Sequence, residues 1–321
     1  MLKKWIAAGA VLSVLTSAAM AADDVSLRLN WQIQGVHAPF YLGLERGYYA
    51  DEDIDLTIGE GRGGGAVAQS VGAGSDTFGV MDAATAMISI SKGIPIRTVM
   101  SFMNQSTLAI IVRADSGIET IQDMKGKTLA LTAGDSGTQL LPAVMSAAGL
   151  DEDSVRKVFV DPAGKLVSVL EKRADALTGS VDSQLIQMEE NGVEGRAFSY
   201  NDLGVPLVAL TIVANVDTIE EDPDLVRRFV AATRKSLEAA IEDPDAAVAA
   251  AVAVKPELDS ELMSKQLAVA LDHLESANTE GTPIGVASEE DWATTLQLLK
   301  QYLGLQTEMS TTDFYTNEFT Q

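Results

Sequence analysis

The chain has 321 residues, of which 46% are hydrophobic, and its 46 acidic against 23 basic residues give a formal net charge of −23. The apolar content excludes a disordered chain, and the acidic charge argues against nucleic-acid or anionic-membrane partners, because such a protein surface repels phosphate groups. The sequence contains no cysteine, which excludes a disulfide framework and an acylated cysteine as a lipid anchor.

The first 21 residues have the pattern of a secretory signal peptide. Lys3 and Lys4 precede an apolar run over residues 5–19, and Ala19-Met20-Ala21 forms a small-residue cleavage site. The run is too short for a retained membrane helix, which needs about 20 apolar residues. We therefore expect cleavage near Ala21/Ala22 and a free protein in a bacterial periplasm. Cleavage removes two lysines and no acidic residue, so the net charge becomes −25.

Short apolar runs then alternate with helical patterns up to about residue 215, which indicates α/β units with a mainly parallel sheet. The expected strands are 25–29, 54–58, 78–81, 96–102, 108–112, 128–131, 157–160, 176–178 and 207–213. The expected helices between them are 40–46, 66–73, 83–92, 137–148, 164–172 and 182–191. From residue 222 onward the pattern is almost purely helical, with expected helices at 222–242, 245–254, 260–274 and 288–303.

This order predicts two lobes. The long apolar strands 108–112 and 207–213 bracket a compact α/β block, so we expect residues 22–110 and 207–321 to form lobe 1 and residues 111–206 to form lobe 2. The two strands would cross between the lobes and serve as a hinge. A cleft between two such lobes is the usual place for a small ligand, and it closes by hinge motion.

The sequence contains few residues or motifs that indicate catalysis. It has two histidines, no cysteine, and none of the common hydrolase, metalloprotease, phosphate-loop or dinucleotide motifs. No metal-ligand spacing and no cofactor motif are evident. The glycine-rich run 59–65 lacks the Lys-Ser/Thr ending of a phosphate loop. It is either an ordinary turn or a loop whose residues Gly63 and Gly64 present backbone N–H groups to the cleft.

Trp31 and His37 lie just beyond the first expected strand, where the chain would enter the cleft. We interpret Trp31 as a flat stacking platform for a planar ligand rather than a core residue. His37 precedes a helix and would either hydrogen-bond the ligand or cap that helix.

Polar residues also follow other strands at their expected carboxyl ends. Asp82 and Asp182 occupy positions where a carboxylate either caps a helix or accepts hydrogen bonds from ring or exocyclic N–H groups of a ligand. The turn Gly134-Asp135-Ser136 opens a helix and is the strongest candidate for binding an anion or a carbonyl. Asn104 is a weaker candidate.

Several motifs together resemble the periplasmic solute-binding proteins of ABC importers, in particular the subgroup that binds thiamine pyrimidine precursors and related heteroaromatics. In the first lobe they are Trp31, His37-Ala38-Pro39-Phe40-Tyr41, Glu45-Arg46-Gly47-Tyr48-Tyr49, the loop 61–65 and the stretch 71–79. In the second lobe they are Asp123-Met124-Lys125-Gly126-Lys127, Gly134-Asp135-Ser136, the stretch 160–165 and Ala174-Asp175-Ala176. The resemblance covers nearly the whole chain after the leader.

The resemblance implies a two-lobe binding fold that captures a small solute and delivers it to an inner-membrane permease with its ATPase. By position it makes Trp31 the stacking residue, and His37, Phe40, Asp82 and the turn 134–136 cleft contacts. The segment 137–139 lacks a basic residue that many relatives carry, which favours a neutral or cationic ring over an anion. Fungal relatives synthesise the pyrimidine precursor at a cysteine-rich iron site, and a chain without cysteine does not match that role.

We therefore expect a monomeric, non-enzymatic binding protein for a nitrogen heteroaromatic solute, with the ring on Trp31 and its N–H groups on Asp82 and Asp182. The first alternative is a binder of sulfonate, taurine or nitrate, which would use the helix N-termini near residues 63–65 and 136–137. The second is a periplasmic enzyme with an aspartate and His37 as acid and base. A sensor subunit is the third.

Overall fold

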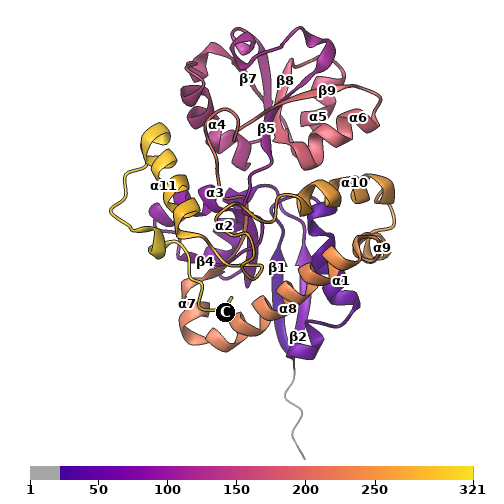
Figure 1. Cartoon of the computed structure of the whole chain (residues 1–321), viewed down its shortest axis with the longest axis vertical. Coiled ribbons are helices and arrows are strands. Elements are labelled where there is room, and N and C mark those ends of the chain that lie inside the picture. Colours follow the sequence, from indigo (N-terminus) through magenta and orange to yellow (C-terminus); the bar gives the residue numbers. More distant parts are fainter. Residues whose placement is uncertain (1–21, 321) are drawn as a thin grey trace, which may run out of the picture.

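A computed structural model describes residues 22–320 of the chain, so the expected signal peptide lies outside the described residues. The protein consists of two α/β lobes, one above the other in Figure 1, and each is built on a five-stranded sheet. The two-lobe α/β class expected from the sequence is confirmed. Among residues 22–320, no helix is both long enough and apolar enough to span a membrane.

The first sheet has the strand order β2-β1-β3-β10-β4. Its strands are β1 (Asp23–Arg28), β2 (Ile54–Gly59), β3 (Phe78–Asp82), β4 (Ile96–Ser101) and β10 (Leu210–Asn215). Helices α1 (Ala38–Glu45), α2 (Gly64–Gly72) and α3 (Ala83–Ser91) alternate with these strands along the chain.

The second sheet has the order β7-β6-β8-β5-β9. Its strands are β5 (Leu108–Arg113), β6 (Thr128–Leu131), β7 (Arg156–Phe159), β8 (Ala176–Ser180) and β9 (Gly195–Ser199). Helices α4 (Ser136–Ala147), α5 (Pro162–Leu170) and α6 (Ile186–Glu190) pack around it, and a π-helical turn, Val181–Leu185, links β8 to α6.

In each sheet a single strand runs against the others. β10 is antiparallel to both β3 and β4, and β5 is antiparallel to both β8 and β9. Each of these strands enters its sheet directly after the chain has crossed from the other lobe, so it starts at the cleft, where the other strands end. β5 and β10, which were expected to cross between the lobes, therefore do not cross, because each belongs to a single sheet. The crossings themselves are the segments 102–107 and 200–209.

The C-terminal third is helical, as expected, and consists of α7 (Val216–Glu221), α8 (Pro223–Glu242), α9 (Pro244–Val254), α10 (Ser260–Leu271) and α11 (Glu289–Leu303). α8 covers the first sheet, where Phe229 stacks on Phe78 of β3 with ring centroids 3.9 Å apart. α11 lies at the side of the molecule, on the left in Figure 1, and contacts α3 of the first lobe and α4 of the second.

Candidate functional site

A cleft between the lobes is the candidate site, with about 650 Å³ of empty space including solvent at its mouth. Strand ends of both lobes line it, because the carboxyl ends of β3 and β8 and the starting residues of β5 and β10 meet there. The residues expected at the site that line this cleft are Trp31, Gly63, Gly64, Asp82, Asp135, Ser136 and Asp182.

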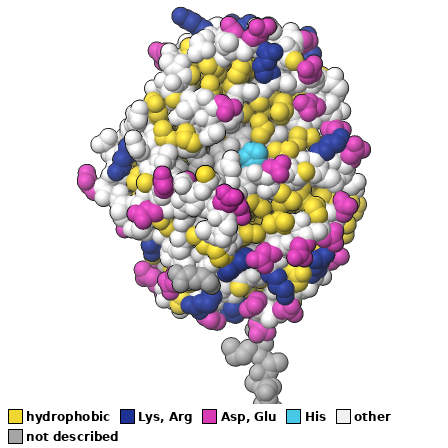
Figure 2. Space-filling view, in the orientation of Figure 1, with side chains coloured by type: hydrophobic (Ala, Val, Ile, Leu, Met, Phe, Trp, Pro, Cys, Tyr) yellow, Lys and Arg dark blue, Asp and Glu magenta, His cyan; other side chains and the backbone are white. Residues whose placement is uncertain are grey.

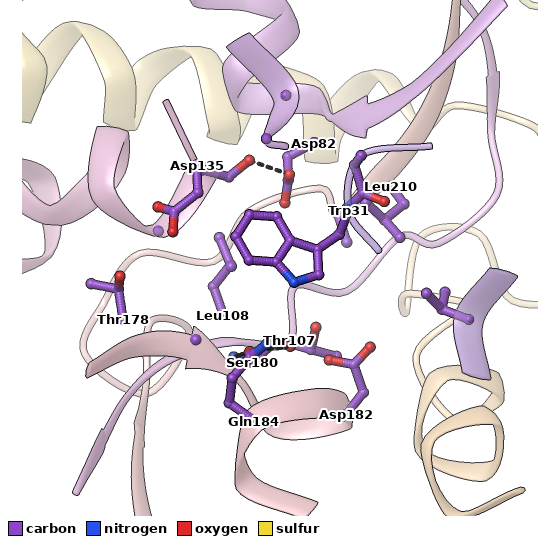
Figure 3. Close-up of a pocket in the computed structure, with 18 of the residues that line it drawn as sticks. Trp31, Asp82, Thr107, Leu108, Asp135, Thr178, Ser180, Asp182, Gln184 and Leu210 are labelled. Carbon is purple, nitrogen blue, oxygen red and sulfur yellow. Dashed lines mark hydrogen bonds between the residues drawn. The ribbon is translucent and has the colours of Figure 1, made fainter. Parts of the chain in front are cut away.

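Trp31 lies in the loop after β1 and is half-buried, with its indole pointing into the cleft in Figure 3. The glycine-rich loop holds this segment in place: the Gly61 N–H donates to the Trp31 carbonyl at 3.0 Å, and the Gly63 N–H donates to the Asn30 carbonyl at 2.8 Å. Gly63 has a φ of 119°, and a Cβ there would lie 2.7 Å from the Gly134 carbonyl of the other lobe. The glycines therefore permit close approach of the lobes beside Trp31.

Asp82 links the two lobes. It is the N-cap residue of α3, but its side chain makes no capping bond. Instead its Oδ2 accepts a hydrogen bond from the Ser136 hydroxyl of α4, marked at Asp82 in Figure 3. The Thr85 hydroxyl donates in turn to Ser136 Oγ at 3.1 Å. Burial raises the pKa of Asp82 to about 6, against the lowering effect of the Ser136 hydrogen bond.

Asp182 faces the cleft from the second lobe, on the π-helical turn after β8. It is 4% exposed, and its Oδ1 has no hydrogen-bond partner. The hydroxyl of Thr178, also on the cleft wall and fully buried, has none either. An unpaired buried polar group costs about 1–3 kcal/mol, which makes these two groups candidates for contact with a ligand.

Asp135 and Lys165 form a buried ion pair at the cleft, with Lys165 Nζ 2.5 Å from Asp135 Oδ2. Asp135 also caps α4, because its Oδ1 accepts from the Thr138 N–H at 2.6 Å. The Lys165 ammonium lies 5.1 Å from the centroid of the Trp31 ring, a cation–π contact between the lobes. Lys165 therefore supplies the cleft with a basic residue, although the segment 137–139 contains none.

Four expected site residues do not line the cleft. Phe40 is in the core of the first lobe, in edge contact with Phe102. The amide of Asn104 donates to the Leu274 carbonyl at 3.0 Å, away from the cleft. Gly134 is exposed, and its carbonyl accepts from the Gly65 N–H of the other lobe at 3.3 Å.

His37 is the fourth, and it is fully buried behind Asn30. Its Nε2 lies 2.8 Å from Asn30 Oδ1, and its Nδ1 accepts from the Gln34 N–H at 3.2 Å. Burial lowers the pKa of His37 to about 3, so the imidazole is neutral at physiological pH. His37 therefore contacts the cleft wall indirectly, through Asn30 and Gln34, which both line it.

The charges around the cleft are predominantly acidic. Asp82, Asp135 and Asp182 face a single ammonium, that of Lys165. Outside the cleft, acidic side chains are scattered over the face shown in Figure 2 rather than gathered in one patch. Among residues 22–320, no cluster of His, Cys, Asp and Glu has the arrangement of a metal site.

Asn30, Gln34, Lys165, Thr178 and Gln184 also line the cleft and were not expected there. Asn30 directly precedes Trp31, so its place at the end of β1 was a signal that could have identified it. Lys165 is the one charged residue of the stretch 162–170, but only the meeting of the two lobes makes it a site residue.

The profile of the family described as NMT1/THI5 like matches residues 34–247, about two thirds of the chain. The chain belongs to the NMT1/THI5-like family. Three curated proteins are similar to this chain. The 4-amino-5-hydroxymethyl-2-methylpyrimidine phosphate synthase of Legionella pneumophila is 26% identical over 75% of this chain and 77% of its own. The formylaminopyrimidine-binding protein of Halalkalibacterium halodurans is 23% identical over 92% and 91%. The riboflavin-binding protein RibY of Chloroflexus aurantiacus is 25% identical over 92% and 86%.

Among solved structures, the periplasmic aliphatic sulphonate binding protein SsuA of Escherichia coli superposes with a TM-score of 0.70. The match covers 93% of this chain and 99% of SsuA at 16% identity, so it shows the shared periplasmic binding protein fold and nothing about the ligand. The chain is thus similar both to proteins named as binders and to a protein named as a synthase.

Proposed function

We propose that this protein is the periplasmic substrate-binding component of an ABC importer and captures a small nitrogen heteroaromatic in the cleft. One observation carries the proposal: the Trp31 indole shares the cleft with the carboxylates of Asp82 from one lobe and Asp182 from the other. In this proposal a flat ring stacks on the indole and directs its N–H groups to the two carboxylates.

The hydrogen-bonding groups of the cleft suit the edge of such a ring. Asp182 Oδ1 and the Thr178 hydroxyl are buried and unpaired, and an ionised carboxylate accepts hydrogen bonds only. Ring or exocyclic N–H groups provide the donors that it needs. The Asn30 amide supplies donors for a ring nitrogen, because its oxygen is already held by His37. A thiamine pyrimidine precursor, an aminopyrimidine, has both kinds of group.

The cleft charges weigh against the sulfonate, taurine or nitrate alternative. A full anion there would face three carboxylates, and the one ammonium, on Lys165, is already paired with Asp135. One N–H group at each helix N-terminus that an anion would use is also occupied, although those of Gly64, Ser136 and Gly137 are not. The Thr138 N–H of α4 donates to Asp135, and the Gly65 N–H of α2 donates to the Gly134 carbonyl.

We favour binding over enzymatic synthesis, although relatives are named as synthases. The chain has no cysteine, and its buried His37 is held neutral behind Asn30, out of contact with the cleft. In this proposal the lobes close around the crossing segments 102–107 and 200–209 as a hinge. The closed protein then docks on an inner-membrane permease.

The test is a binding screen of the secreted chain, residues 22–321, by thermal shift followed by calorimetry. Ligands are aminopyrimidines, formylaminopyrimidine, thiamine, riboflavin, taurine, alkyl sulfonates and nitrate. A ligand at about 100 times its Kd adds about 2.7 kcal/mol to stability. We expect shifts from heteroaromatics, and we expect Trp31→Ala and Asp182→Asn each to weaken their binding at least tenfold while the fold is retained. Shifts from the small anions alone would overturn the proposal.

A further inference from the structure

A second cavity adjoins the site cleft. It encloses about 930 Å³ of empty space including solvent at its mouth, and it shares Trp31, Gln34 and Gln184 with the cleft. We call it the α5/α10 groove. One wall comes from α5 and α6 of the second lobe, and the other comes from α10 of the C-terminal part. Side chains that face it include Leu166, Val167, Gln187, Leu262, Met263 and Gln266.

Contacts between the lobes already flank this groove, so the groove is not simply the space between two separated lobes. At its inner end the Ser183 hydroxyl donates to Gln34 Oε1 at 2.5 Å. Beside it, Lys265 Nζ on α10 lies 2.5 Å from Glu190 on α6. α10 is thus held against α6 and the π-helical turn. The groove is therefore present even though its two walls already contact each other beside it.

The groove has fewer charged side chains than the cleft. Its one charged wall residue is Asp259, whose carboxylate already caps α10 by accepting from the Glu261 and Leu262 N–H groups. The other side chains are apolar or carboxamides. Gln266 is buried, and its Nε2 has no hydrogen-bond partner, although its Oε1 accepts from the Gly35 N–H at 3.0 Å. An unsatisfied amide donor indicates a missing acceptor, and the groove lining has no basic residue to balance an anionic one, which favours a hydroxyl or carbonyl oxygen.

We propose that the α5/α10 groove receives an uncharged, hydroxyl- or amide-bearing substituent of the ligand whose ring lies beside Trp31. The inference rests on the proposed function, because the ring must first occupy the cleft. Both cavities border on Trp31, Gln34 and Gln184, so in this proposal the ring lies in the cleft and its chain passes these side chains into the groove. The substrate class is therefore a flat nitrogen heteroaromatic with a neutral polar chain, rather than a bare ring.

The test uses matched probes with the same ring, with and without a neutral hydroxylated chain: riboflavin against lumiflavin, and cytidine against cytosine. Calorimetry on residues 22–321 gives the Kd of each compound. In every pair whose ring binds, we expect the chain-bearing member to bind at least tenfold more tightly. Val167→Trp, on the groove wall and 40% exposed, should fill the groove and abolish this advantage while the bare ring binds as before.

Val158→Trp is the matched control, since Val158 is 42% exposed on β7 of the same lobe and does not line the groove. Ala163→Trp is a second filling variant at an exposed groove position, for use if Val167→Trp does not fold. Equal affinities within each pair, or an advantage that both filling variants leave intact, overturn the groove proposal and leave the proposed function standing. Failure of every heteroaromatic ring to bind overturns both.

Discussion

The Nε2 atom of the buried His37 lies 2.8 Å from Oδ1 of Asn30. Because the Gln34 N–H occupies Nδ1, the proton of the neutral ring is on Nε2 and is donated to Asn30. The Asn30 amide oxygen is thereby fixed, and its NH2 group is left for the cleft. His37 is thus a positioning residue for a cleft donor.

Replacing His37 by Gln should change how stability depends on pH. The native pKa of His37 is lowered to about 3, whereas the unfolded chain protonates near 6.5. The stability that the neutral His37 contributes is therefore fully present above pH 6.5 and is lost as the pH falls from 6.5 toward 3. Urea unfolding at pH 7.5, 6 and 4.5 should show the wild type losing more stability than His37→Gln on acidification. An equal loss of unfolding free energy on acidification in the wild type and in His37→Gln would contradict a buried neutral imidazole.

Ligand affinity should depend on the ionisation of Asp82. Its pKa, raised to about 6 by burial, means that the carboxylate is an acceptor above pH 6 and becomes protonated below it. For a ligand whose own charge does not change over this range, affinity should fall by up to about tenfold per pH unit below 6. Asp82→Asn should bind more weakly at pH 7.5 and lose this pH dependence. A wild-type affinity unchanged from pH 7.5 to 5 would exclude Asp82 as a contact.

Stacking on Trp31 should be visible by fluorescence. From residue 22 onward the chain contains only Trp31 and Trp292, and Trp292 is fully buried against Tyr315. A heteroaromatic ligand should quench the Trp31 emission in proportion to the occupied fraction. Trp292→Phe should keep this ligand-dependent change, and Trp31→Phe should remove it. The reverse pattern would place the ligand elsewhere.

The Lys165–Asp135 pair should be strongly coupled. Removing one partner of a buried pair leaves the other charge uncompensated, so Lys165→Met and Asp135→Asn should each cost about 3–5 kcal/mol of unfolding free energy. The double variant should lose clearly less than the sum of the two, as measured by a double-mutant cycle in urea. Additive losses would show that the two charges do not stabilise each other.

Most strands and helices could be predicted because they are apolar and strongly periodic. β9 (Gly195–Ser199) was missed because it is short, half-buried and lacks an apolar run. α7 (Val216–Glu221) was missed because it is short and acidic and has no buried residue.

The cleft was predicted less completely, because its composition depends on which side chains meet across the lobes. Trp31 and Asp82 follow their strands, so position alone indicated them. Phe40 belongs to the same motif as His37, yet both are buried, since the sequence does not show which face of a turn meets the core. Lys165 was missed for the converse reason: its partners, Asp135 and Trp31, are far from it in the sequence.

The π-helical turn Val181–Leu185 holds Asp182 at the cleft and Gln184 at the wall shared with the groove. A π-turn contains one residue more than an α-helical turn, and such turns occur often at functional sites. Losing or gaining that single residue would change which side chain faces each cavity, while β8 and the buried residues of α6 could keep their packing. Relatives on this fold could therefore exchange one ligand for another by a one-residue length change in this turn, without rebuilding either lobe.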